Sequence, residues 1–164
     1  MNKLFNQAVN VYLAAPFFSE SQIKKVELLE NALLENALSK NKTVANFFSP
    51  MRCQHPESLP QEVEAFTPEW AKATMENDVN EVNKADIIVA IVDFDHQDTD
   101  SGTAWELGYA IALEKPTYLI RFEDTIPANI MLTERNRAFF TQIEQVEEYD
   151  FLESKLIPYS GKYQ

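Results

Sequence analysis

The sequence predicts one α/β domain, in which a doubly wound parallel sheet of five strands is flanked by helices. Segments rich in Val, Ile and aromatic residues alternate with segments of helical composition along the chain, as they do where helices join parallel strands. The segment ADIIVAIVDF is apolar enough for a central strand that is buried on both faces. The chain has 164 residues and no low-complexity linker, so we expect a single domain over 1–164.

The first half of the chain is expected to form two strands, two helices and a long loop. The apolar segment AVNVYLAAP is a strand that ends at Pro16. Ser19 and Gln22 have the spacing of a capping box, which marks the start of a helix. TVANFFSP has the composition of a second strand, and three prolines then indicate a loop before the next helix. These elements cover residues 8–16, 19–39, 43–50, 54–69 and 69–83.

The second half is expected to form three strands and two helices. The helix after ADIIVAIVDF ends before Pro116, and PTYLIRF and AFFTQI are short apolar strands. These elements cover residues 85–94, 103–114, 116–122, 138–143 and 147–155. Ligands of parallel sheets bind at the carboxyl ends of the strands. The segments AAPFF, FSPMRCQ and DFDHQDTDSG are therefore expected to surround the site.

Composition excludes several classes of partner. Lys and Arg number 14 against 26 Asp and Glu, for a net charge of −12. A field of that sign repels nucleic acids and anionic membranes and favours a neutral or cationic small molecule. No apolar run reaches the roughly 18–20 residues of a membrane helix, and the N-terminal MNKLFNQAVN lacks the apolar core of a signal peptide. Together with a single cysteine, Cys53, this indicates a cytoplasmic protein.

Two acids flank a glycine where the central strand gives way to a helix, in DTDSGTAWELGYAIAL. Thr103 and Glu106 fit a capping box, and the field of a helix N-terminus would lower the pKa of a glutamate there. An ionised, held carboxylate is equally what a nucleophile at a sugar carbon needs. Asp100 is either a turn or N-cap residue or, beside a second carboxylate, an acid that carries a proton. Acid and nucleophile form such a pair in retaining glycosidases.

Other polar and aromatic side chains fall near the same strand ends. Asp78 lies on one helical stripe with Trp70 and Val82, so it borders the buried face and needs a partner. That partner is a polar ligand, a backbone amide or Tyr12. Aromatic residues after the first strand, such as Phe18, belong either to the core or to a pocket. The amide of Gln54 follows the second strand and can both donate to and accept from a base edge.

Metal and phosphate chemistry find less support. Asp93, Asp95, Asp98 and Asp100 lack the glycine and terminal glutamate of a calcium loop at the required offsets. The chain has only three glycines and neither a P-loop nor G-x-G-x-x-G. We therefore expect no metal and no dinucleotide cofactor.

Several segments resemble, in order and spacing, those of the nucleoside 2-deoxyribosyltransferases. They are VYLAAPFF, EWAKATMENDVNEVNKADIIVAIVD, DSGTAWELGYAIALEKPTYLI, ANIML and the C-terminal tyrosine region. The third of these is the most specific, and the resemblance covers nearly the whole chain. It implies a flavodoxin-like fold, a homohexamer, no cofactor and a place in deoxyribonucleoside salvage.

The resemblance also implies a role for each matched residue. The catalytic residues are Glu106 as the nucleophile, Asp100 and Asp78 as the acids that serve the base, and Tyr12, which orients the nucleophile. The substrate-binding residues are Gln54, Phe18 and Gly102, together with Asn129 and Met131 from a neighbouring subunit and the tail residue Tyr163. The family's tail commonly ends on a tyrosine, whereas here Gln164 follows Tyr163.

The expected activity is exchange of the base of a 2′-deoxyribonucleoside for a free purine or pyrimidine, through a covalent deoxyribosyl-glutamate. Two alternatives stay open at this point. An N-glycoside hydrolase acting on a nucleoside or deoxynucleotide would use water as the acceptor, and a non-catalytic module would only sense nucleosides. Arg135 and Arg137 are the cations available for a 5′-phosphate.

Overall fold

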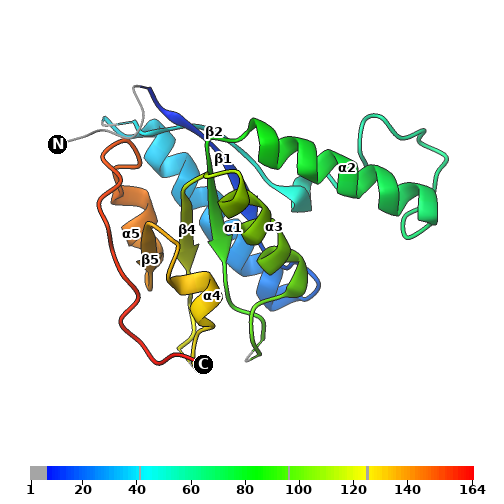
Figure 1. Ribbon diagram of the computed structural model, residues 1–164. Helices are drawn as coiled ribbons and strands as arrows, with labels where there is room; N and C mark the ends of the chain where they lie inside the picture. The colour runs from blue at the N-terminus through cyan, green and yellow to red at the C-terminus, as the bar shows by residue number, and fades with distance from the viewer. Residues whose placement is uncertain (1–6, 41, 96, 125) are drawn as a thin grey trace.

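The computed structural model describes residues 7–40, 42–95, 97–124 and 126–164, so the first six residues of MNKLFNQAVN lie outside it. Within this part of the chain, five parallel strands form one sheet in the flavodoxin-like order β2-β1-β3-β4-β5. The strands are β1 (Val9–Ala14), β2 (Val44–Phe48), β3 (Ile87–Ile91), β4 (Thr117–Ile120) and β5 (Ala138–Phe140). The helices are α1 (Glu20–Leu38), η1 (Pro50–Arg52), α2 (Pro68–Lys84), α3 (Ser101–Ala112), α4 (Ile130–Thr133) and α5 (Ile143–Glu148). The predicted fold class is confirmed (Figure 1).

The two faces of the sheet carry two separate cores, because side chains alternate along each strand. Val11 and Leu13 of β1 point to the face that α1 and α5 cover. Tyr12 and Ala14, between and after them, point to the opposite face, where Val82 of α2 and Leu107 of α3 pack. All five residues of β3 are buried, as expected for the central strand.

The carboxyl ends of β1 and β3 lie side by side, with Ala14 paired to Ala90. The loops that follow these two strands therefore meet at one edge of the sheet. Helix α2 packs on the sheet only near its C-terminal end, where Val82 is the buried residue. Its N-terminal half and the loop before it extend away from the sheet (Figure 1).

The last helix and the strand before it differ from the sequence-based predictions. The last helix is α5, Ile143–Glu148, and not 147–155, because Gln142 and Gln145 form a capping box that starts it earlier. That box also ends the fifth strand at Phe140, short of the predicted 143. The side chain of Asp150 then accepts hydrogen bonds from the backbone N–H groups of Leu152 and Glu153 (both 2.9 Å). These bonds hold the segment after α5 in a turn.

Helix α4 was not predicted, because a helix of four residues shows no periodicity. The side chain of Asn129 caps it by accepting a hydrogen bond from Met131 N (2.9 Å). The C-terminal tail runs beside it, with Ala128 bridged to Tyr163. In the described part of the chain no helix is long and apolar enough to cross a membrane.

Candidate active site

Tyr12 and Glu106 form the central contact of the site. Tyr12 is 0% exposed, and its hydroxyl donates a hydrogen bond of 2.6 Å to Glu106 Oε1. The strand β1 supplies the tyrosine and helix α3 the glutamate, so a contact between residues 94 positions apart fixes the carboxylate. Glu106 Oε2 has no hydrogen bond to any described residue and is left available.

Glu106 is not the third residue of a capping box. Asp100 is the N-cap of α3, and its Oδ2 accepts hydrogen bonds from the backbone N and the hydroxyl of Thr103 (3.0 and 3.3 Å). The helix therefore begins at Ser101, two residues before the predicted start, and Glu106 lies in its second turn. The cap interpretation of Glu106 is wrong, whereas the cap interpretation of Asp100 is confirmed.

Burial raises the pKa of Glu106 from 4.5 to about 7. The hydrogen bond from Tyr12 lowers that pKa, and the charges of Asp78 and Asp100 raise it further. The expectation that the helix field would keep the pKa of Glu106 low is wrong, because the dipole acts mainly within the first turn while burial acts on the whole side chain. Burial and the charge of Glu106 also raise the pKa of Tyr12 far above its ordinary value, so its hydroxyl stays a donor.

Asp78 on α2 is the second perturbed acid. Burial raises its pKa from 3.8 to about 6, and the side-chain amide of Asn77, 3.5 Å from Oδ1, partly offsets this rise. Among the described residues, neither a backbone amide nor Tyr12 hydrogen bonds to the Asp78 carboxylate. Its charge nevertheless raises the pKa values of both Glu106 and Tyr12. The charges of Asp78 and Asp100 thus both raise the pKa of Glu106.

Gly102 lies against the cap. A Cβ at this position would approach Asp100 Oδ2 to 3.1 Å, closer than ordinary van der Waals contact. The absence of a side chain lets the Asp100 carboxylate turn onto Thr103. Its Oδ1 atom has no hydrogen bond to any described residue, so the cap occupies only one of its two oxygens.

Phe18 lies on the surface above the site-forming edge of the sheet. It is 72% exposed, stacks on Phe17 with ring centroids 5.8 Å apart, and meets Phe94 edge to face at 6.5 Å. An aromatic ring this exposed is a ready stacking surface for a planar ligand. The alternative that Phe18 belongs to the core is excluded by its exposure.

Gln54 is exposed, but its amide is turned back onto its own chain. The Nε2 group donates to Met51 O (3.0 Å), and the backbone carbonyl of Gln54 accepts from the indole of Trp70 (2.9 Å). A contact with a base edge therefore requires a change in the Gln54 side chain.

Asn129, Met131 and Tyr163 make no recorded contact with Glu106 among the described residues. Asn129 and Met131 line a surface pocket of about 280 Å³ on the outer side of α3, together with Gly108. Met131 is 76% exposed. Tyr163 packs edge to face on Tyr159 beside the strand-like bridge to Ala128. Asp98 and Thr99 line the same pocket as Asn129 and Met131.

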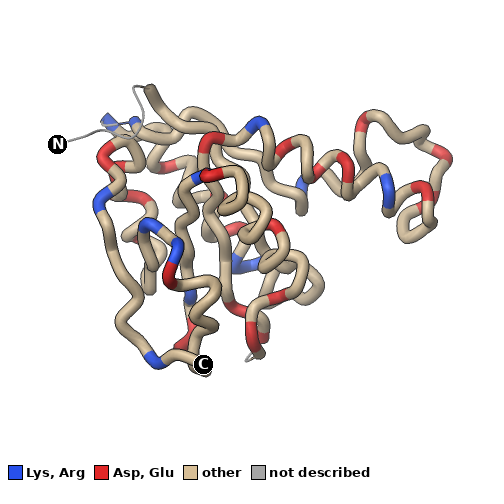
Figure 2. Tube along the Cα trace, in the orientation of Figure 1, with Lys and Arg blue, Asp and Glu red and all other residues tan. Residues whose placement is uncertain are grey.

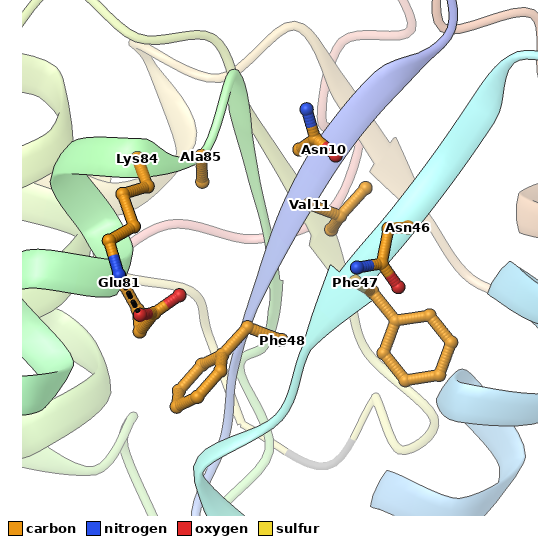
Figure 3. Close-up of a pocket in the computed structure, with 8 residues that line it drawn as sticks. All are labelled: Asn10, Val11, Asn46, Phe47, Phe48, Glu81, Lys84 and Ala85. Atoms are coloured by element: carbon orange, nitrogen blue, oxygen red, sulfur yellow. Dashed lines mark hydrogen bonds and ion pairs between the residues drawn. The ribbon is translucent and has the colours of Figure 1, made fainter.

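A pocket of about 240 Å³ lies between β1, β2 and the end of α2, and Asp78, Asp100 and Glu106 are not among its lining residues. Figure 3 shows Phe48 of β2 pointing toward the ion pair of Glu81 and Lys84 (2.7 Å) on α2. Phe48 also stacks on Tyr12 at 5.7 Å, so this ring separates the pocket from the Tyr12–Glu106 pair. Sequence reasoning missed Phe48. Its position at the carboxyl end of the strand beside β1 was the available signal.

The charge around the site is mostly negative. Acidic residues outnumber basic ones along α2 and the loop before it (Figure 2). Among the described residues, no group of three or more His, Cys, Asp or Glu is arranged to hold a metal ion. The site offers carboxylates, a phenol, amides and aromatic rings.

Comparison with known proteins gives a family match over most of the chain. A family model described as nucleoside 2-deoxyribosyltransferase matches residues 11–142, which include Tyr12, Asp78, Asp100 and Glu106. The nucleoside deoxyribosyltransferase of Limosilactobacillus fermentum is 33% identical over 129 residues, 74% of this chain and 73% of that protein.

Solved structures agree with this match. The 2-deoxyribosyltransferase of Bacillus psychrosaccharolyticus is 35% identical with a TM-score of 0.77, and the match covers 92% of this chain and 99% of that chain. A 2-desoxiribosyltransferase from Leishmania mexicana has the same fold, with a TM-score of 0.57 at 22% identity, over 85% of this chain and 98% of that chain. The chain is an enzyme and belongs to the nucleoside 2-deoxyribosyltransferase family.

Proposed function

We propose that this enzyme exchanges the base of a 2′-deoxyribonucleoside for a free base through an ester between deoxyribose and Glu106. The observation that carries the proposal is the buried Tyr12–Glu106 contact. The tyrosine hydroxyl holds Oε1 at 2.6 Å and leaves Oε2 free to attack. A nucleophile held in one orientation needs little rearrangement on the way to the transition state.

In the first half-reaction, Glu106 Oε2 forms a bond to C1′ while the bond between C1′ and the base nitrogen breaks. The electron pair of that bond goes to the base, which takes up a proton from Asp100, with Asp78 assisting. A second base then attacks C1′ through a ring nitrogen and returns its N–H proton to Asp100, while the electrons of the ester bond go back to Glu106, so the configuration is retained overall. A missing 2′-hydroxyl eases formation of the oxocarbenium-like transition state, which fits a deoxyribose substrate.

Two of these acids have raised pKa values that lie near neutral pH. Glu106 must be ionised to attack, and its pKa of about 7 leaves a large share of it ionised near neutral pH. Asp78, with a pKa of about 6, keeps some proton at the same pH. General acid catalysis works best when the pKa of the acid lies near the working pH. The route draws on side chains alone and needs no cofactor.

We propose that Phe18 stacks on the base, that Gln54 reads its edge, and that Gly102 lets the substrate approach Asp100. Asn129 and Met131 would complete the site of a neighbouring subunit in a hexamer, with Tyr163 beside them. The 76% exposure of Met131 supports a role at the surface of a neighbouring subunit.

The decisive assay incubates the enzyme with thymidine or deoxyinosine and several free bases. Formation of a new nucleoside supports exchange, release of the base alone supports the hydrolase alternative, and no reaction supports a sensing module. Glu106→Ala should bind nucleoside nearly as well as the wild type but form no new nucleoside. A 2-fluoro-2-deoxy donor should leave a sugar on the peptide that contains Glu106. An adduct on Asp100 or Asp78 would overturn the assignment.

Asp100→Asn separates the two roles of Asp100, because asparagine caps a helix as well as aspartate does but carries no acidic proton. If Asp100 is the acid, the loss should fall within the roughly 10²–10⁴-fold range of general acid catalysis and be greatest for bases that leave poorly. An equal loss for every base would assign Asp100 to positioning alone.

Hybrid oligomers test the neighbouring-subunit role. Asn129→Ala protein should be weakly active and Glu106→Ala protein inactive, and a mixture should regain activity in sites that take an intact residue from each chain. A fully active monomer by light scattering would overturn this part of the proposal.

A further inference from the structure

The same capping motif occurs twice in this chain, and only one copy makes a second contact. At the start of α5, Gln145 Oε1 accepts hydrogen bonds from the backbone N–H groups of Thr141 and Gln142 (2.8 and 3.0 Å). At the start of α1, Gln22 Oε1 accepts from Phe18 and Ser19 in the same way (2.7 and 3.2 Å). Each glutamine side chain thus satisfies backbone donors that the helix leaves free.

The amide nitrogen distinguishes the two glutamines. Gln22 Nε2 donates a hydrogen bond of 2.8 Å to Asp95 Oδ2, across 73 residues of sequence. The hydroxyl of Ser19 donates to the same carboxylate oxygen (3.2 Å). Among the described residues, Nε2 of Gln145 makes no such contact. Gln22 is only 3% exposed, so its amide is fully committed within the protein.

Asp95 is held in an unusual conformation at this contact. Its φ is 43°, in the left-handed region that residues other than glycine rarely adopt and that Asp tolerates better than most. The Gln22–Asp95 contact therefore joins the first turn of α1 to a constrained residue in the loop after β3. The two strands are neighbours in the sheet, which makes the short link possible.

Two contacts of Phe18 involve residues in or next to the Gln22–Asp95 link. The backbone N–H of Phe18 is bound by Gln22, and its ring rests edge to face on Phe94, the residue before Asp95. Phe17 is its other aromatic neighbour among the described residues. A ring that is 72% exposed would otherwise sample several rotamers.

We infer that Gln22 is a positioning residue for the base: its amide ties Phe18 to Asp95 and so sets the place of the stacking ring. The inference rests on the proposed role of Phe18 in base binding. It gives the capping glutamine a second task that a helix cap alone does not require. Breaking the link should weaken binding of the base more than it slows the chemical steps at Glu106.

Gln22→Glu is the first test variant. A glutamate keeps the acceptor for the Phe18 and Ser19 N–H groups, so the cap survives, but it loses the amide donor and sets a carboxylate against Asp95. We expect dissociation constants for free bases to rise about tenfold, within the roughly 5- to 150-fold range that loss of one base–aromatic stack produces. The KM for the base should rise likewise, with kcat changed less than about threefold.

The double variant Q22E/D95N reverses donor and acceptor and should restore the link, and with it tight base binding. Gln145→Glu is the matched control, because it makes the same change in a capping box that has no second contact. It should leave base binding unchanged. Thermal unfolding of each variant shows whether any loss of binding follows from a loss of folded protein.

Binding is measured by calorimetry with adenine and thymine, in wild type and in the Glu106→Ala background, so the readout does not depend on turnover. If the wild type binds bases but exchanges none, the proposed reaction fails while this test still runs. Unchanged affinity in Gln22→Glu would overturn the inference, as would a loss that Q22E/D95N does not repair. Either result would leave Gln22 as a helix cap alone.

Discussion

Two acids near the carboxyl edge of the sheet, Asp93 and Glu106, differ in how the protein compensates their negative charge. Asp93, after β3, accepts hydrogen bonds from the N–H groups of Phe122 and Glu123 (2.6 and 3.3 Å). Lys25 and Arg121 each approach its carboxylate to 3.9 Å. Glu106, on the other face, receives one hydrogen bond from a neutral phenol. Its other close charges, Asp78 and Asp100, are negative.

The pKa values of Asp93 and Glu106 reflect this difference in compensation. Burial raises the pKa of Asp93 as well, but the two N–H groups and Lys25 work against that rise. For Glu106, only the Tyr12 hydrogen bond opposes burial, and the pKa reaches about 7. A carboxylate that is buried and short of compensating charge is costly to the fold, which suits a group kept for chemistry. The predictions below test that contrast by stability first and by activity second.

Removing Asp93 should have the largest effect on stability. Asp93→Ala leaves Lys25 and Arg121, both buried, without part of their compensation, and frees two buried N–H groups. Breaking a buried charge pair from one side typically costs about 3–5 kcal/mol. Urea unfolding at pH 7 measures this loss, with Asp93→Asn as the control that keeps an acceptor for the N–H groups. A loss below about 1 kcal/mol would contradict the assignment of Asp93 to structure.

Neutralising Glu106 should have the opposite sign. A folded-state pKa of about 7, against 4.5 for an ordinary glutamate, means that the folded state binds this proton more tightly than the unfolded chain does. Its stabilising effect is complete below pH 4.5 and is lost as the pH rises through 7. At pH 8, Glu106→Gln should therefore be more stable than wild type, by on the order of 3 kcal/mol at about 1.4 kcal/mol per pKa unit.

The check is a pair of urea titrations. The gain of Glu106→Gln should shrink toward zero at pH 4.5, where wild-type Glu106 is protonated. An equal gain at both pH values would point to packing as the cause. A loss at pH 8 would contradict the claim that the ionised Glu106 carboxylate is poorly compensated.

The fold could be predicted from sequence because its signals are local and repeated. Each apolar strand, such as 85–94, stands between prolines, caps or helical stretches, and alternation then fixes a parallel sheet. The short helix α4 escaped because four residues carry no period, and the last helix was misplaced because Gln142 and Gln145 were not recognised as a capping box.

The sequence predicted the residues that the structure brings around Glu106, namely Tyr12, Asp78 and Asp100, but not their electrostatics. The motif around Glu106 selected the residue, and its resemblance assigned Tyr12 beside it. The pKa of Glu106, however, depends on how deeply the folded chain buries it, which no spacing records. The link from Gln22 to Asp95 is equally invisible in sequence, because the local capping box accounts for Gln22 without it.

Removing the single donor to Glu106 should have a moderate effect on the pH profile. Tyr12→Phe deletes the one hydrogen bond that lowers the pKa of Glu106. Hydrogen bonds to charged groups contribute about 1.5–3 kcal/mol, so this pKa should rise by about one to two units. The acid limb of kcat/KM against pH should then move upward from about 7. Phe48, which stacks on Tyr12, keeps the ring in place. An unmoved limb would assign that limb to another group.

Two glycines of α3 provide the test with the smallest expected effect. It concerns Asp100, which caps the helix and is the proposed proton donor. Alanine at either position lowers the entropy cost of helix formation, worth up to about 1 kcal/mol. At Gly108 a Cβ meets nothing within 4 Å, so Gly108→Ala should stabilise the protein by about 0.5–1 kcal/mol with kcat/KM unchanged. At Gly102 the new Cβ would lie 3.1 Å from Asp100 Oδ2 and push that carboxylate from its place on Thr103. Gly102→Ala should gain less stability and lose several-fold in kcat/KM, most for bases that leave poorly. Equal behaviour of the two variants, in thermal unfolding and in the exchange assay, would show that the position of the Asp100 carboxylate does not limit proton transfer to the base.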